Sequence, residues 1–482
     1  MKRMKHSVLP LLALLAVSFP AFAQDVSASK DVAITIYNQN FGLIKDRRDI
    51  KLKDGINYVR FEDVAAAIDP TSVSFTSLTA PNAVSVREQN YQYDLMDTET
   101  ILSRSLGKTV KFRQFLSGGA VRELTGTLLS SPAVTVADSD GNLSQRSQSV
   151  VLRTGSGIVV GPSGELELAE LPEGLVSKPS LLWKLECDKA GSHESEISYQ
   201  AQGLNWKCDY VAVANSDDSA CDLTSWVTLD NKSGASYKDA SLKLMAGDVH
   251  KVANVPPPAP AAPMMAEMAA DAAAPQFNEQ TFAEYHLYSL KGRTDVRDNE
   301  TKQLTLFNAS AVPVKKLYVM ESGRATEYGE DGSEKIKVNV KLEVNNSKEN
   351  NLGLPLPKGK VRVYKKDQDG AMQFVGEDQI DHTPKDEKVR VYIGDAFDIA
   401  CNRIQTSQEQ VSDRVQRQSF SISIRNHKKE PVTVTVVEHS YGDWKILKSS
   451  LPYTKRDSHT FEFLVKVSPD TEEKLTYTIE TR

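Results

Sequence analysis

The sequence predicts a mainly β protein made of several antiparallel β-sandwich modules with immunoglobulin-like character and only a few short helices. Apolar and polar residues alternate along most of the chain, as in residues 336–344, with the two-residue period of a half-buried strand. Helical periodicity is scarce, and its best example spans residues 97–106, with Asp97 as N-cap and Gly107 after the last turn. Between the alternating runs lie pairs that tolerate the positive φ of tight hairpin turns, namely Asp54-Gly55, Asp140-Gly141, Asp331-Gly332 and Asp369-Gly370.

Length and composition indicate a folded chain with more than one domain. The 482 residues correspond to two or three domains at roughly 150 residues each. A hydrophobic content of 40% with 25% charged residues excludes the disordered, collagen-like and disulfide-dense classes. The net charge of −6 argues against nucleic acid as a partner, because nucleic-acid recognition uses a concentrated basic face.

The first 23 residues have the pattern of a signal peptide. Lys2, Arg3 and Lys5 precede an apolar run at residues 8–17, and Ala21-Phe22-Ala23 fits the small-x-small cleavage rule. We therefore expect export, to the periplasm or the cell surface. No other stretch approaches the roughly 18 apolar residues of a membrane-spanning helix, so we expect the cleaved chain not to span a membrane.

Export affects how the four cysteines are interpreted. Cys187, Cys208, Cys221 and Cys401 allow three pairings in an oxidising compartment, and their spacing does not choose among them. Isolated thiols buried in strands are an equal alternative to one disulfide. In neither case do we expect a catalytic role.

One segment interrupts the strand pattern and suggests the domain organisation. Residues 253–276 are rich in Pro, Ala and Met, and a run of prolines does not fit a central strand. We expect an N-terminal β domain at 24–177, a β-sandwich module at 178–252, this linker, and a C-terminal β portion at 277–482. Alternatively, the 178–252 module is continuous with the C-terminal part, and the linker is then an insertion within one domain.

Four predicted strands end in asparagine followed by a polar turn. Asparagine accepts left-handed conformations and bonds neighbouring backbone groups, so it terminates a strand readily. This pattern is common in immunoglobulin-like sandwiches, although ordinary hairpin turns also produce it. The four residues are Asn231, Asn308, Asn345 and Asn426.

The densest polar cluster lies in residues 353–382. Folding at Asp369-Gly370 brings two strands together, and a carboxylate pair beside an Arg and a His is able to bind an anion or support acid–base chemistry. A solvent-facing hairpin with cross-strand ion pairs is the alternative. The candidate binding residues are Arg362, Tyr364, Glu377, Asp378 and His382.

Other chemistry-bearing patterns are weak. The sequence contains no nucleophile elbow, zinc-protease helix, phosphate-binding loop or dinucleotide fingerprint, so we expect no catalytic residues, metal or cofactor. Exposed tryptophans would indicate carbohydrate stacking, whereas buried ones belong to sandwich cores, and the core assignment is favoured. The four are Trp183, Trp206, Trp226 and Trp444.

Several segments together resemble one bacterial exported family. The chain is similar to the domain of unknown function that forms the C-terminal part of mucoidy inhibitor A proteins, over nearly the whole length after residue 23. The resemblance implies a β-rich envelope protein with immunoglobulin-like character and brings no established catalytic residues. The segments include YNQNFGLIKD (37–46), FEDVAAAIDPTSV (61–73), GLNWKCDYVAV (203–213), WVTLDNKSGASYKDASLKLMAGDV (226–249) and LGLPLPKGKVRVYKKDQDG (352–370).

These observations predict an exported cell-envelope protein without enzymatic activity, which binds a partner or has a structural role. An envelope protein or polysaccharide is the expected partner, and nucleic acid is not. The alternative is a hydrolase or lyase that acts on envelope glycans through the cluster from Glu377 to His382.

Overall fold

The structure is a computed structural model that describes residues 26–93, 98–115, 120–137, 143–170, 172, 175, 178–251, 276–367 and 369–482. The predicted signal peptide, the N-cap Asp97 and nearly all of the predicted linker lie outside these residues. The mainly β prediction is confirmed, since α1 (Thr98–Arg104) is the one α-helix of the described part, beside the 3₁₀ turns η1 (Pro70–Ser72) and η2 (Lys348–Asn350). Gly107, at φ 77°, follows α1 as predicted.

The described strands form six sheets. Sheet A has the order β18 (Phe277–Phe282), β19 (Tyr285–Val296), β17 (Tyr237–Ala246), β1 (Asp31–Tyr37), β2 (Phe41–Leu52), β14 (Gly191–Gln202), β4 (Ser74–Ser77). Sheet B is β3 (Gly55–Glu62), β13 (Ser180–Cys187), β5 (Val84–Gln92). Sheet C is β20 (Glu300–Pro313), β16 (Ala220–Asn231), β15 (Leu204–Ala214), β24 (Gly359–Lys366), β25 (Met372–Ile380).

The remaining sheets lie in the C-terminal part and in a small module. Sheet D is β29 (Trp444–Ser449), β32 (Thr471–Thr481), β27 (Val415–Asn426), β26 (Lys388–Ser412), β23 (Glu334–Asn345), β21 (Lys315–Glu321), β28 (Val432–His439), β31 (Thr460–Val467), β30 (Tyr453–Lys455), with β22 (Ala325–Tyr328) beside β23. Sheet E is β11 (Gly157–Val160), β10 (Val151–Thr154), β7 (Val121–Ser130), β6 (Thr109–Phe115), β12 (Glu165–Glu167), and β8 (Ala133–Ala137) pairs with β9 (Leu143–Ser147).

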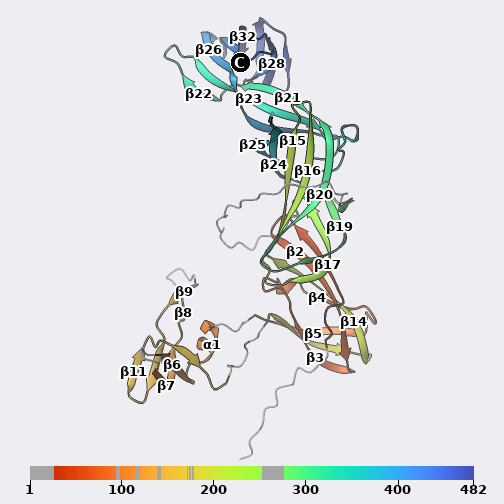
Figure 1. The fold of residues 1–482 in the computed structure, drawn as a ribbon, viewed down its shortest axis with the longest axis vertical. Helices are drawn as coiled ribbons and strands as arrows, with labels where there is room; N and C mark the ends of the chain where they lie inside the picture. Colours follow the sequence, from red (N-terminus) through yellow and green to blue (C-terminus); the bar gives the residue numbers. More distant parts are fainter. Residues whose placement is uncertain are drawn as a thin grey trace, which may run out of the picture.

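Three apolar cores hold these layers together. The largest joins sheets A, B and C, and Figure 1 shows these sheets following one another along the molecule, with sheet D at the C-terminal end. Trp183 of sheet B packs on Phe75 of sheet A with ring centroids 5.4 Å apart. Trp206 of sheet C donates its indole N–H to the carbonyl of Met245 in sheet A at 3.1 Å. A second core lies within sheet D, and a third lies between α1 and sheet E.

The same strand connections occur twice along the chain. In the first set, β16 pairs with β20, β17 pairs with β19, and β17 runs parallel to β1. In the second set, β27 pairs with β32, β28 pairs with β31, and β28 runs parallel to β21. Sheet D curls over so that its layers face each other, and the rings of Phe463 in β31 and Tyr477 in β32 lie 5.5 Å apart. Two sandwiches of corresponding topology therefore follow one another.

Asparagine marks the corresponding corner of both sandwiches. Asn231 is buried where β16 ends, and its Nδ2 donates to the carbonyls of Ala235 (2.9 Å) and Val296 (3.2 Å). Asn426 does the same where β27 ends, with the carbonyls of Glu430 (2.9 Å) and Val467 (3.3 Å). In each case the amide oxygen accepts the N–H two residues later, so the side chain shapes the turn through which the chain crosses to the other layer.

Of the other two asparagines, Asn345 ends its strand as predicted and Asn308 does not. Asn308 lies inside β20 and not at its end. Asn345 ends β23 but is exposed, and the bridging role belongs to its buried neighbour Asn346, which donates to the carbonyls of Leu354 and Pro384 at 2.8 and 2.9 Å. A strand-ending position therefore does not by itself identify the asparagine that turns into the core.

The structure distinguishes between the alternatives left open for the cysteines and tryptophans. All four cysteines are buried, free thiols. Burial raises the pKa of Cys208 and Cys401 to about 12, so these thiols are poor nucleophiles. Trp183 and Trp206 are core residues as expected, whereas Trp226 and Trp444 keep part of their surface exposed.

Candidate ligand-binding site

The structure separates the residues of the predicted polar cluster. Arg362 and Glu377 lie opposite each other on β24 and β25, with Arg362 Nε 3.5 Å from Glu377 Oε2. Lys360 Nζ lies 3.1 Å from the other oxygen of Glu377. The ring of Tyr364 packs edge-on against Phe374 at 5.7 Å. This part of the cluster is an ion-paired hairpin on one face of sheet C.

A buried carboxylate extends this hairpin network. Asp209 of β15 lies 3.5 Å from Arg362 Nη1, and its other oxygen accepts a hydrogen bond from the Thr228 hydroxyl at 2.9 Å. Arg362 therefore balances two carboxylates, Asp209 and Glu377. The network is neutralised internally and has no group poised to transfer a proton.

Asp378 and His382 lie away from the other predicted residues. Asp378 follows Glu377 and points to the opposite face, where its Oδ2 accepts the N–H of Tyr392 at 2.7 Å. β25 approaches β26 this closely because residue 376 is glycine, where a Cβ would lie 2.3 Å from the carbonyl oxygen of Ile393. The five predicted residues consequently do not form one pocket.

His382 lies beyond the end of β25. Its Nδ1 accepts the backbone N–H of Lys358 at 3.1 Å, and its Nε2 lies 3.3 Å from the Asn38 amide. Burial lowers the pKa of His382, and the nearby Lys358 lowers it further. The imidazole is therefore held neutral, as part of the junction between sheets A and C.

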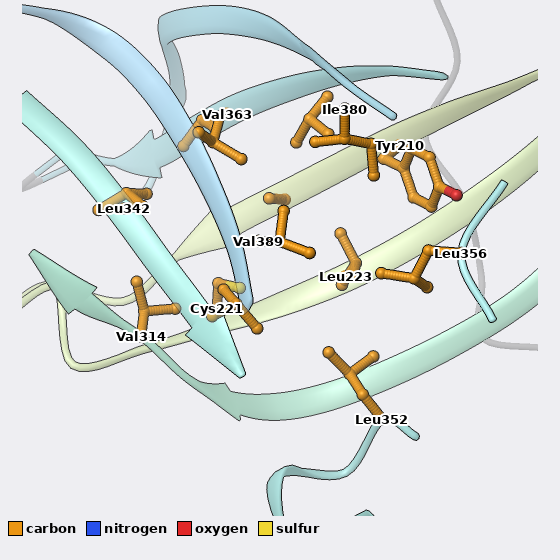
Figure 2. Close-up of a pocket in the computed structure, with 14 residues that line it drawn as sticks. Tyr210, Cys221, Leu223, Val314, Leu342, Leu352, Leu356, Val363, Ile380 and Val389 are labelled. Carbon is orange, nitrogen blue, oxygen red and sulfur yellow. The ribbon is translucent and has the colours of Figure 1, made fainter. Parts of the chain in front are cut away.

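An apolar cavity lies on the inner side of sheet C, between that sheet and strands β23 and β26. Its volume is about 40 Å³, and Figure 2 shows the aliphatic side chains that surround it. The hydroxyl of Tyr210 at its margin donates to the carbonyl of Pro357 at 2.7 Å. A void of this size and lining is a packing defect that stays dry, and we do not consider it a ligand site. Its lining includes Ala212, Cys221, Leu223, Leu342, Leu356, Val363 and Val389.

A much larger cleft opens where sheet B ends over sheet A. Its volume is about 800 Å³, within the range of sites that bind organic ligands. Five strands of sheet A floor it, and the segments after β3 and before β13 form its wall together with the N-terminal segment. Its described lining is Ala28, Ser29, Lys30, Asp31, Val32, Ile44, Asp46, Arg48, Asp63, Val64, Lys178, Pro179, Tyr199, Gly234, Ala235, Ser236, Tyr237, Lys238, Asp239, Arg293 and Asp298.

A buried ion pair lies in the floor of this cleft. Asp46 and Arg48 occupy the inward-facing positions of β2, between Ile44 and Ile50, and are only 7% and 8% exposed. Arg48 donates from Nε (3.0 Å) and Nη2 (2.7 Å) to one oxygen of Asp46, and Ser29 donates to the other at 2.5 Å. The guanidinium also stacks on the ring of Phe61 at 3.9 Å, so its position is tightly held.

One nitrogen of the Arg48 guanidinium differs from the other two in its hydrogen bonding. Nε and Nη2 donate to Asp46, whereas no group in the described part of the chain accepts a hydrogen bond from Nη1. Arg403, the second arginine held over a phenylalanine ring, differs, since its three nitrogens donate to Glu438, Glu334 and Tyr477. Arg48 therefore offers a fixed donor to the cleft, whereas Arg403 is satisfied within its own sandwich.

Two phenols and a ring of ion pairs complete the cleft. Burial raises the pKa of Tyr199 well above its usual value and that of Tyr237 to about 12, so both hydroxyls stay protonated. At the rim, Arg293 lies 2.7 Å from Asp31 and 3.1 Å from Asp239. The cleft thus combines neutral hydroxyls, apolar surface and paired charges.

Sequence reasoning did not identify this cleft, although one signal for it was present. In residues 44–50, Asp46 and Arg48 share the parity of Ile44 and Ile50, so two charged side chains fall on the apolar face of a strand. Tyr199, Tyr237 and Arg293 carry no comparable signal, because they are remote in sequence from this strand.

Comparisons with known proteins assign a family without a function. Residues 195–481 match the family described as domain of unknown function (DUF4139). No curated protein matches the chain. The matched region supplies one side of the cleft, including Tyr199, Tyr237 and Arg293, whereas Asp46 and Arg48 precede it.

Two features are absent from the part of the chain that the structure describes. None of the helices in this part has the length and apolar character needed to cross a membrane. No group of three or more His, Cys, Asp or Glu side chains among its residues is placed to hold a metal ion.

Proposed function

Because the chain belongs to the DUF4139 family, whose description includes no activity, we propose its function from the structure: it is a non-enzymatic binding protein that takes its ligand in the cleft over sheet A. The observation that carries this proposal is Arg48, a residue only 8% exposed in the floor of an 800 Å³ cleft, whose Nη1 has no hydrogen-bond acceptor among the described residues. A hydrogen bond from a charged donor such as this guanidinium to a ligand acceptor contributes about 1.5–3 kcal/mol.

The rigid support of Arg48 favours binding. Asp46 fixes the guanidinium from one side and Phe61 from its face, so little side-chain entropy is lost when a ligand accepts from Nη1. The ion pair also keeps the arginine from acting as a free charge. These features are typical of a recognition group.

The geometry gives less support to an envelope-glycan hydrolase or lyase. Glu377 is engaged by Arg362 and Lys360, Asp378 by a backbone N–H, and His382 by a different backbone N–H. A general acid and base need to converge on one substrate atom, and these groups face three different directions. We therefore retain binding as the proposed activity.

The same proposal places the protein in the cell envelope, either in the periplasm or at the surface. Its support is the signal-peptide pattern of residues 1–23 and the resemblance to the C-terminal part of mucoidy inhibitor A proteins. The expected partner is an envelope protein or polysaccharide. Mass spectrometry of the N-terminus in fractionated cells tests export, since a chain that begins at Gln24 in the exported fraction is expected and an uncleaved cytoplasmic chain would refute it.

Hydrogen exchange with and without an extract of the native envelope tests the binding site. The extract is expected to slow exchange in β2 and β17, which floor the cleft. Ala28→Trp places a large ring in the cleft from an exposed wall position and is expected to abolish the protection. Ala371→Trp, at an exposed turn outside the cleft, is the matched control. Unchanged exchange in both strands with every envelope fraction would refute the proposal.

A further inference from the structure

The chemistry of the cleft indicates what class of ligand it takes. Resting on the proposed function, we propose that the cleft binds a neutral, hydroxyl-rich saccharide segment. Three properties carry this assignment: the charge balance of the lining, the pairing of β2 on both sides at the Asp46–Arg48 pair, and the adjacent donor and acceptor of that pair.

The described lining carries equal numbers of opposite charges. Its five basic residues are Lys30, Arg48, Lys178, Lys238 and Arg293, and its five acidic residues are Asp31, Asp46, Asp63, Asp239 and Asp298. Most of them are already neutralised by a neighbour, as in Lys178–Asp63 at 2.5 Å and Arg293–Asp31 at 2.7 Å. Such a lining produces little net field, so an ion of either sign gains little from entering.

At the Asp46–Arg48 pair the floor does not offer a strand edge to an extended peptide. Peptides that bind along a sheet do so by pairing with a free strand edge. β2, which carries both residues, pairs with β14 along its whole length and with β1 over Phe41–Arg47. Beyond β1, Lys30 and Ser27 donate their backbone N–H groups to the carbonyls of Arg47 (2.8 Å) and Asp49 (2.9 Å). Recognition at this pair therefore comes from side chains.

The Asp46–Arg48 pair matches a hydroxyl group. A hydroxyl donates one hydrogen bond and accepts two, so a protein donor and a protein acceptor that lie close together are able to bind the same hydroxyl. Among the described residues no group accepts from Arg48 Nη1, and the Asp46 carboxylate accepts three hydrogen bonds, which leaves acceptor capacity on Oδ1. Ala28 and Ala235 in the same lining keep apolar surface exposed for the C–H face of a sugar ring.

The test uses the envelope extract after selective destruction of its components. The probe is the fraction that passes an anion-exchange resin, and hydrogen exchange in β2 and β17 of the full exported chain is the readout. Protection is expected to survive proteinase K and to be lost after periodate, which cleaves vicinal diols. Arg48→Lys keeps the charge opposite Asp46 but removes the Nη1 donor. This variant is expected to need at least ten times more probe for the same protection.

Each alternative result has a defined meaning. Protection that is lost to proteinase K, resists periodate or stays on the anion exchanger would overturn the saccharide assignment while the proposed function stands. If the untreated extract protects neither strand, the proposed function itself fails. Circular dichroism shows whether Arg48→Lys folds. If it does not, binding of the neutral fraction is compared between Ala28→Trp and the control Ala371→Trp. Equal binding by these two variants would also overturn the assignment.

Discussion

Replacing Asn426 by alanine tests whether the corner asparagines hold the sandwiches together. Asn426 is fully buried, and its Nδ2 donates to the carbonyls of Glu430, Val467 and Ser468 at 2.9, 3.3 and 3.1 Å. Its Oδ1 accepts the N–H of Lys428 at 3.0 Å. Two amide hydrogens and one oxygen are lost, at about 1 kcal/mol each, so we expect a loss of about 3 kcal/mol in the free energy of unfolding.

The assay is urea unfolding at neutral pH, followed by tryptophan fluorescence and hydrogen exchange. Trp444 packs on Phe461 in the same sandwich, with ring centroids 4.9 Å apart, so its emission reports on that module. Exchange is expected to accelerate in β27 and β28, on either side of the corner, and not in sheet B.

Asn345→Ala is the matched control, because Asn345 also ends a strand but is exposed. We expect it to change the free energy of unfolding by less than about 0.5 kcal/mol. If Asn426→Ala is as mild as this control, then the buried hydrogen bonds do not stabilise the corner and the reasoning is wrong.

Three further predictions concern other parts of the structure. Glu438→Gln leaves the buried Arg403 guanidinium without its main counter-charge, and we expect a loss of about 3–5 kcal/mol in urea unfolding; a loss below about 1 kcal/mol would contradict this. Burial lowers the pKa of His382 below its ordinary value of 6.5, so its contribution to stability is present above pH 6.5 and is lost as the pH falls from there through the lowered pKa. His382→Gln should therefore flatten the fall in melting temperature between about pH 7 and pH 5, and an unchanged slope would refute this. Ala212→Val adds methyl groups to the 40 Å³ apolar cavity and should stabilise the protein by about 0.5–1 kcal/mol; a lower melting temperature would mean that the cavity does not accommodate them.

Local pairing explains why part of the hairpin cluster was predictable. The turn at Asp369-Gly370 joins consecutive strands, so the sequence implies that Arg362 lies near Glu377, and the structure pairs them. Asp378 is the residue after Glu377 and therefore points to the opposite face of the strand. His382 lies beyond the strand, where no alternation rule applies, and its partners are Lys358, just before β24, and Asn38, in the turn before β2.

The sequence by itself determined the β class, the hairpin turns at Asp331-Gly332 and Asp369-Gly370, and the residues that alternate into a core, because these depend on neighbours a few positions away. Only the tertiary structure decided where the cleft lies. Asp46, Tyr199, Tyr237 and Arg293 come from strands more than 200 residues apart at the extremes, and sheet A brings them together. Period-two alternation predicts which face of its strand a side chain occupies, but what covers that face depends on the packing of remote strands. Over Arg48 this packing leaves the cleft open.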